Sequence, residues 1–249
     1  MSIVDIETKR KLREMNAGDL LAAIESQDEA LSMHLAFEER VRLLVDDAYS
    51  EFANSKVAGL LRRAGLRYPN ADLRRVDLIE ERGLSRTMIA ELGTCSFVER
   101  RDNVVFQGFT GSGKSYLGCA LAKQACQHRI RAHYIRMPDL EEAWAQAKDK
   151  PSGAAKFLRK YASFTMLVLD EWLLDKPSEP MQSMLLELLE RRYDATSTVF
   201  CTQYPQKDWH QRLGSGVHAD AIMDRIIHNT IWMETGTFNM REQVNAAGR

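Results

Sequence analysis

The stretch GFTGSGKS, residues 108–115, directly follows the apolar run 104–106 and fits the pattern G-x-x-x-x-G-K-[ST]. Glycines at these positions allow the backbone to bend so that successive N–H groups point at phosphate oxygens. A helix that begins near Lys114 would add its positive N-terminal end to the same anion site. The stretch therefore predicts a loop, between a strand and a helix, that binds the phosphates of a nucleoside triphosphate.

The residue types in this loop also assign individual roles. Lys114 is expected to reach the β- and γ-phosphates, and the Ser115 hydroxyl is expected to ligate Mg²⁺. The full set of expected nucleotide contacts is Gly108, Thr110, Gly111, Ser112, Gly113, Lys114, Ser115 and Tyr116.

Two later apolar runs end in polar residues that suit the same chemistry. The run FTMLVLDEW, residues 164–172, ends in Asp170-Glu171. Asp170 is expected to hold Mg²⁺ through water beside Ser115, and Glu171 to act as the base that polarises the attacking water. The next run ends in Thr202-Gln203, and Gln203 is the favoured candidate for sensing the γ-phosphate or positioning the water. These positions predict an ATP-hydrolysing site.

Beyond residue 103 the chain alternates between runs typical of strands and runs typical of helices. Strands are expected at 104–107, 132–137, 165–169, 198–202 and 230–234, and helices at 116–128, 140–146, 154–161 and 180–193. Repeated βα units of this kind predict an α/β fold with a parallel sheet between layers of helices.

The composition favours no particular class of partner. The 249 residues carry a formal net charge of −1, so any surface for nucleic acid must be a local patch. No apolar run approaches the roughly 20 residues that a membrane-spanning helix needs, and the N-terminus lacks the apolar core of a signal peptide. The four cysteines form no C-x-x-C motif, which predicts reduced thiols in a cytoplasmic protein.

The N-terminal part is expected to be a small all-helical unit. Apolar residues recur there at three- to four-residue steps between residues 3 and 52. Two interpretations stay open: an amphipathic bundle without chemistry, or a docking surface for a partner protein. A turn signal at Pro69-Asn70 places the expected boundary between a helical partner-binding domain, 1–66, and a nucleotide-binding domain, 67–249.

Two basic groups are candidates for contact with DNA, and a solvated surface is the alternative for each. The first group lies in segment 60–75 and consists of Arg62, Arg63, Arg67, Arg74 and Arg75. The second group consists of Lys148, Lys150, Lys156, Arg159 and Lys160, of which the last three recur at helical spacing. Because no helix-turn-helix or zinc-finger pattern is present, backbone contacts independent of base sequence are expected.

Taken together, these motifs and the later Met223-Asp224-Arg225 resemble AAA+ ATPases in the branch of DnaC-like helicase loaders and transposition helpers. The segments KLREMNAGDLLAAIESQ, LAFEERVRLLVDDAYSEF, LLRRAGLRYPNADLRRVDL, FVERRDNVVFQGFTGSGKS and CTQYPQKDWHQRLG are similar to the IstB family, the ATP-binding helpers of insertion-sequence transposases. The resemblance covers nearly the whole chain. It implies an AAA+ fold, ATP and Mg²⁺ as cofactors, and duplex DNA and the transposase of the same element as partners.

The resemblance also implies a homo-oligomer with active sites at subunit interfaces. Arg225 matches the arginine that AAA+ proteins insert into the nucleotide site of a neighbouring subunit. The alternative for Arg225 is a surface salt bridge with Asp224 or Asp220. AAA+ proteins usually continue into a helical lid, for which too few residues follow Arg225 here. Arg241 is the remaining candidate for a second arginine sensor.

Two rival functions share part of this pattern. A replicative helicase loader would have the same ATPase core but would act on a hexameric helicase and on single-stranded DNA. An ATP-binding scaffold would bind nucleotide with little turnover, and Glu171 argues against it because such a protein needs no base.

Overall fold

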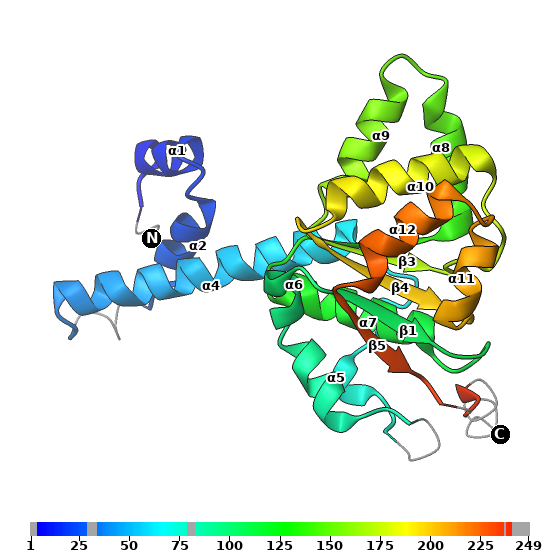
Figure 1. Ribbon diagram of the computed structural model, residues 1–249. Helices are drawn as coiled ribbons and strands as arrows, with labels where there is room; N and C mark the ends of the chain where they lie inside the picture. The colour runs from blue at the N-terminus through cyan, green and yellow to red at the C-terminus, as the bar shows by residue number, and fades with distance from the viewer. Residues whose placement is uncertain (1–3, 29–33, 79–82, 237, 241–249) are drawn as a thin grey trace, which may run out of the picture. The chain divides into compact units, whose positions relative to one another are not determined.

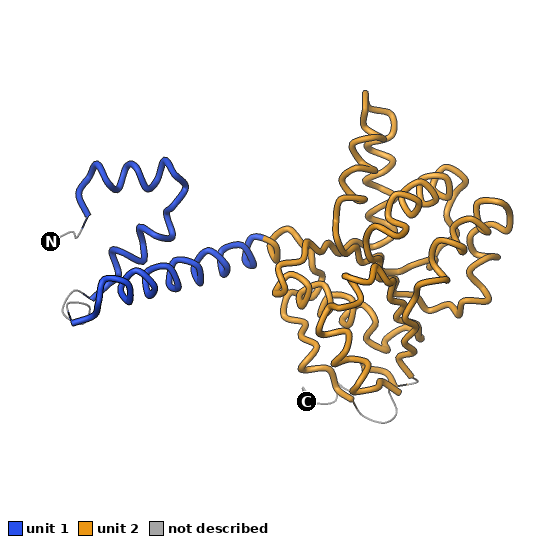
Figure 2. The backbone as a smooth tube through the Cα atoms, turned by 60° about the vertical axis from the view of Figure 1, so that its left-hand side comes forward, with its two compact units in different colours: residues 1–59 blue, residues 60–249 orange. Residues whose placement is uncertain are grey.

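The computed structural model describes residues 4–28, 34–78, 83–236 and 238–240 (Figure 1). The chain divides into two compact units, Met1–Gly59 and Leu60–Arg249, which Figure 2 shows in different colours. No helix among the described residues is both long enough and apolar enough to cross a membrane.

The first unit is helical, as the sequence predicts. Its helices are α1, Ile6–Glu14, α2, Gly18–Ser26, and the first part of α4, Phe37–Arg63. Helix α1 begins where the Asp5 side chain accepts a hydrogen bond from the backbone N–H of Thr8, at 2.9 Å.

The division between the units comes a few residues before the expected boundary at 66 and 67. Leu60, in the last turn of α4, and Ala64, directly after the helix, are buried in the core of the second unit. The whole basic segment 60–75 therefore lies in the second unit, including the short 3₁₀ helix η1, Leu73–Arg75.

A five-stranded parallel sheet forms the centre of the second unit, as predicted. Its strands are β1, Asn103–Gln107, β2, Ala132–Arg136, β3, Met166–Asp170, β4, Ser197–Thr202, and β5, Thr230–Glu234. They lie in the order β2-β3-β4-β1-β5, so β1 pairs with β4 on one side and with β5 on the other. The carboxyl ends of all five strands consequently meet at one edge of the sheet, next to the glycine-rich loop.

Alternate residues of a strand point to opposite sides of the sheet, and apolar side chains on both sides are buried by helices. On one face Val104, Phe106 and Val168 are fully buried with the apolar side of α7, Lys114–Gln127. Helices α5, Arg86–Gly93, and α6, Ser96–Arg100, complete this layer.

The opposite face is covered by the later helices of the chain. There Val105, Leu167 and Phe200 are buried together with residues from these helices. The helices are α8, Met137–Lys148, α9, Gly153–Ala162, α10, Glu179–Arg192, α11, Gln206–Arg212, and α12, Val217–Ile227. The sheet between two helical layers confirms the predicted α/β class.

Candidate nucleotide site

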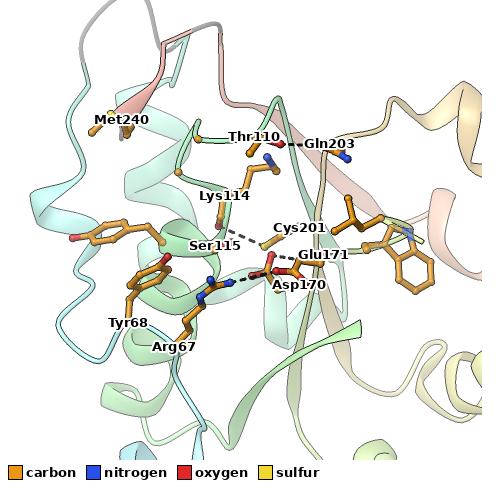
Figure 3. Close-up of a pocket in the computed structure, with 15 residues that line it drawn as sticks. Arg67, Tyr68, Thr110, Lys114, Ser115, Asp170, Glu171, Cys201, Gln203 and Met240 are labelled. Atoms are coloured by element: carbon orange, nitrogen blue, oxygen red, sulfur yellow. Dashed lines mark hydrogen bonds and ion pairs between the residues drawn. The ribbon is translucent and has the colours of Figure 1, made fainter. Parts of the chain in front are cut away.

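The glycine-rich loop borders a cavity of about 560 Å³ at the carboxyl edge of the sheet (Figure 3). The predicted nucleotide residues that line this cavity are Thr110, Gly111, Gly113, Lys114, Ser115 and Tyr116. Gly113 has a φ of 93°, a left-handed conformation that suits glycine, and it caps α7 so that the helix begins at Lys114. The exposed N–H groups of this first turn are therefore directed at the cavity.

Gly108 and Ser112, the other two predicted nucleotide residues, are not among the residues that line the cavity. Ser112, in the middle of the loop, is completely buried. Within the loop, the Lys114 Nζ donates to the carbonyl of Phe109 at 2.7 Å.

Neighbouring strand ends bring the predicted catalytic groups to the same cavity. Asp170 is the last residue of β3, Glu171 follows it and Gln203 follows β4, and all three line the cavity together with Lys114. Thr110 Oγ1 donates to Gln203 Oε1 at 3.0 Å, so the loop and the polar end of β4 are in direct contact (Figure 3). The sheet thus gathers residues that are far apart in the sequence.

Asp170 is a buried acceptor with two fixed donors. Its side chain accepts a hydrogen bond from the backbone N–H of Glu171 at 2.9 Å and another from the hydroxyl of Tyr134. Burial, followed by the nearby charge of Asp170, raises the pKa of Tyr134 well above its ordinary value, so the phenol keeps its proton. Tyr134 is therefore a permanent donor that fixes the orientation of the Asp170 carboxylate.

Glu171 is held by two arginines. Arg136, the last residue of β2, donates to one carboxylate oxygen at 2.9 Å, and Arg67 lies 3.3 Å from the other. Glu171 has a φ of 59°, a conformation that is uncommon outside glycine and that turns its side chain into the cavity region (Figure 3). Hydrogen bonding to Glu171 raises the pKa of the Arg136 guanidinium, which stays charged.

The position of Arg67 differs from the expectation that it belongs to an arm for DNA. Its guanidinium contacts Glu171 and lines the nucleotide cavity. The physical reason is that the chain after α4 passes along the N-terminal end of α7, where the backbone N–H of Asp72 donates to the hydroxyl of Tyr116 at 3.1 Å. Segment 67–72 therefore forms one wall of the site.

The oxygen donors fit a magnesium ion that is bound together with nucleotide. The Ser115 hydroxyl and the Asp170 carboxylate both line the cavity, and oxygen is the ligand that Mg²⁺ prefers. Within the described residues, no three His, Cys, Asp or Glu side chains come together as a metal site.

The remaining basic candidates lie on the surface. Arg62, Arg63, Arg74 and Arg75 are exposed, and Arg74 forms a bidentate pair with Asp72. Helix α9 buries Phe157, Leu158 and Tyr161 and exposes its basic residues on the other side. Those basic residues are Lys156, Arg159 and Lys160, which share one face as the spacing predicts.

Arg225 lies away from the nucleotide cavity of its own chain. It belongs to α12 and lines a small pocket with Asn103 and Thr198, which are at the amino ends of β1 and β4. Its guanidinium pairs with Glu190 at 2.7 Å and with Asp224 at 3.0 Å. Arg225 does not line the nucleotide cavity of its own chain. Arg241 lies outside the described residues.

Sequence reasoning missed several residues that build the site. Tyr134 and Arg136 belong to β2, whose register places Arg136 beside Asp170. Arg136 could have been found from its place at the end of a predicted strand, the same signal that identifies Asp170 and Gln203. Met240, which also lines the cavity, carries no such signal.

Comparisons with known proteins agree with this geometry. Residues 10–247 match the family described as IstB-like ATP binding protein. An insertion-sequence ATP-binding protein of Sinorhizobium fredii is 36% identical over 198 residues, which cover 80% of both chains. A second such protein of S. fredii is 32% identical over 225 residues, covering 90% of this chain and 88% of that one.

The fold is that of solved AAA+ proteins. The crystal structure of the DnaC helicase loader has a TM-score of 0.56 at 21% identity, covering 68% of this chain and 98% of that chain. The crystal structure of DnaI has a TM-score of 0.55 at 20% identity, covering 69% and 91%. The match to the family spans almost the entire sequence, including the loop, both carboxylates and Gln203. The chain therefore belongs to the IstB-like ATP-binding proteins, which are associated with insertion sequences.

Proposed function

We propose that this protein hydrolyses ATP with Mg²⁺, assembles with ATP on duplex DNA, and recruits or activates the transposase of an insertion sequence. The observation that carries the proposal is the convergence of Lys114, Asp170, Glu171 and Gln203 on one cavity. A site that only held ATP would need the loop but no carboxylate positioned as a base.

In this proposal the loop binds the phosphates and the strand ends carry out the reaction. Lys114 exchanges its contact with Phe109 for the β- and γ-phosphates. Ser115 and Asp170 would hold Mg²⁺, which neutralises the charge that develops on the phosphates. Glu171 takes a proton from the attacking water, and Gln203 orients that water or the γ-phosphate.

Complete sites are proposed to form between subunits. Arg225 is directed away from its own cavity and is held by acidic partners at the opposite edge of the sheet. Placed beside a neighbour's γ-phosphate, its guanidinium would stabilise the transition state. Assembly and hydrolysis would then be coupled in a homo-oligomer.

Contact with DNA is proposed for the two exposed basic groups. Lys156, Arg159 and Lys160 on α9 share a face, and Arg62 and Arg63 at the end of α4 and Arg75 in η1 are exposed. Contacts to the phosphate backbone from such residues are independent of base sequence and weaken with salt. Arg67 and Arg74 are left out because each is engaged by a carboxylate.

The transposase is proposed as the protein partner because the relatives are named as proteins of insertion sequences. The helical unit, residues 1–59, contains none of the nucleotide motifs and is the proposed docking element. A protein truncated to residues 60–249 is expected to bind ATP and to fail to capture the transposase. Unchanged capture would contradict this part.

The central test compares steady-state ATP hydrolysis of the wild type, Lys114→Ala and Glu171→Gln, with and without duplex DNA. Lys114→Ala is expected to lose ATP binding because the phosphates lose their cation. Glu171→Gln is expected to bind ATP and to form long-lived complexes on DNA without turnover. Turnover of Glu171→Gln at the wild-type rate would refute the assignment of the base, and stimulation by single-stranded DNA alone would favour a helicase loader.

A further inference from the structure

The chain that follows β5 returns to the phosphate loop and touches it at three positions. Thr235, directly after the strand, is completely buried. Its hydroxyl lies 2.6 Å from Ser112 Oγ and 3.1 Å from the carbonyl of Gln107. Its backbone N–H donates to the same carbonyl at 2.8 Å. Thr235 therefore connects the residue before the loop to the middle of the loop.

The first glycine of the loop is fitted to this threonine. A Cβ atom built on Gly108 would lie 2.0 Å from Thr235 Oγ1 and 3.0 Å from Ser112 Oγ. The distance to Thr235 Oγ1 is shorter than any normal contact and that to Ser112 Oγ is tighter than most, so a larger residue would displace the Thr235 hydroxyl. The glycine is required here by the packing of Thr235 against the loop, in addition to any need of the phosphate.

Residues 238–240 make the third contact. The backbone N–H of Met240 donates to the carbonyl of Gly111 at 3.0 Å. Asn239 lies against the same residue, because a Cβ on Gly111 would be 2.4 Å from Asn239 Oδ1. The side chain of Met240 lines the nucleotide cavity on the side of the loop (Figure 3).

We propose that Thr235 and residues 238–240 are positioning residues of the nucleotide site, which hold the phosphate loop in the conformation that binds ATP. A loop with three glycines in eight residues has many alternative conformations, and ordering it on binding would weaken affinity. Contacts that order the loop beforehand avoid this loss. The inference rests on ATP binding at this loop.

The decisive experiment uses the pair Thr235→Val and Thr235→Ser. Valine has nearly the same shape but lacks the hydroxyl, whereas serine keeps it. A net hydrogen bond contributes about 0.5–1.5 kcal/mol. The dissociation constant of Mg-ATP, measured by calorimetry, should therefore rise about threefold to tenfold for Thr235→Val and stay within about twofold of wild type for Thr235→Ser.

A kinetic measurement separates positioning from general damage to the fold. Thr235→Val is expected to raise KM for ATP with kcat nearly unchanged, because the catalytic groups on β3 and β4 are untouched. ATP affinity of Thr235→Val equal to wild type would overturn the inference. So would equal weakening in Thr235→Ser, because serine retains the hydroxyl.

A second pair of variants tests the hydrogen bond from the Met240 N–H to Gly111, and it replaces the first pair if Thr235→Val does not fold. Met240→Ala keeps the backbone N–H that Gly111 accepts, and Met240→Pro removes it. Met240→Pro should bind ATP about threefold to tenfold more weakly than Met240→Ala. Equal affinities would overturn the role of residues 238–240.

The Lys114→Ala variant distinguishes a failure of this inference from a failure of ATP binding at the loop. If Lys114→Ala loses ATP while both pairs show no difference, the loop binds ATP without help from the C-terminal residues. If Lys114→Ala binds ATP normally, the assignment of the loop itself is wrong.

Discussion

Substitution of Arg67 by alanine should raise the basal rate of ATP hydrolysis. In the structure Arg67 lies 3.3 Å from one oxygen of Glu171, while Arg136 holds the other oxygen at 2.9 Å. A carboxylate that acts as a base must turn toward the attacking water, and each arginine opposes that movement. Removal of one arginine lowers the free energy needed to release the carboxylate.

The size of the effect follows from the exposure of the pair. The Arg67 side chain is 41% exposed and that of Glu171 is 22% exposed, so solvent screens their attraction. Exposed pairs contribute about 0.2–1 kcal/mol, which corresponds to a rate about 1.4-fold to fivefold higher for Arg67→Ala. Arg67→Lys keeps the charge but loses the planar donor group, so its basal rate should lie between those of the wild type and Arg67→Ala.

The assay is steady-state hydrolysis at saturating ATP without DNA, combined with duplex binding at two salt concentrations. Arg75→Ala is the matched control, because Arg75 is exposed in the same basic segment. We expect Arg75→Ala to keep the basal rate and to weaken DNA binding with a smaller salt dependence. If Arg67→Ala instead weakens DNA binding and leaves the basal rate unchanged, the contact with Glu171 has no role and the original interpretation as a DNA arm is correct.

Three further variants test a contact between subunits and two buried sets of hydrogen bonds. A mixture of Arg225→Ala and Glu171→Gln should hydrolyse ATP faster than either variant alone, because some subunit interfaces combine an intact base with an intact arginine. Such arginines affect rates by about 10³–10⁵-fold. A mixture no faster than either variant would show that Arg225 acts within its own chain. Tyr134→Phe should lower the free energy of unfolding, measured by urea denaturation, by about 1.5–3 kcal/mol, because the buried Asp170 carboxylate loses one of its hydrogen-bond donors. Unchanged stability would contradict that hydrogen bond. Arg192→Leu should lower the free energy of unfolding by about 2–5 kcal/mol, because the buried guanidinium donates to the carbonyls of Tyr161, Phe164 and Ser197. A decrease below about 1 kcal/mol would show that these carbonyls find other partners.

Much of the fold could be predicted because its signals are local. Most strands of the sheet are short and largely apolar, and the expected strand 230–234 agrees with β5 at both ends. The glycine-rich loop and Asp170-Glu171 are recognised from residue types that follow such runs. The parallel order of strands then brings them together without further information.

The contacts that could not be predicted depend on tertiary structure. Arg67 was grouped with its basic neighbours because charge is all that the sequence displays there. Its partner, Glu171, is 104 residues away in the chain, and only the path of segment 67–72 along α7 brings the two together. Helices α11 and α12 were likewise missed, because their short apolar patterns acquire meaning only when Trp209 and Ile222 are buried against the sheet.

The position of β1 between β4 and β5 has a consequence for synthesis on the ribosome. The phosphate loop is made early, but its Ser112 contacts Thr235, which lies 123 residues later. At about 5–20 residues per second, the nascent chain extends for roughly 6–25 s before that partner exists. Until β4 is made, β1 lacks both of its neighbouring strands, and until β5 is made one edge of β1 stays open to wrong pairing or to a chaperone. Nascent chains that end before Thr235 should therefore bind ATP more weakly than chains that include residues 235–240.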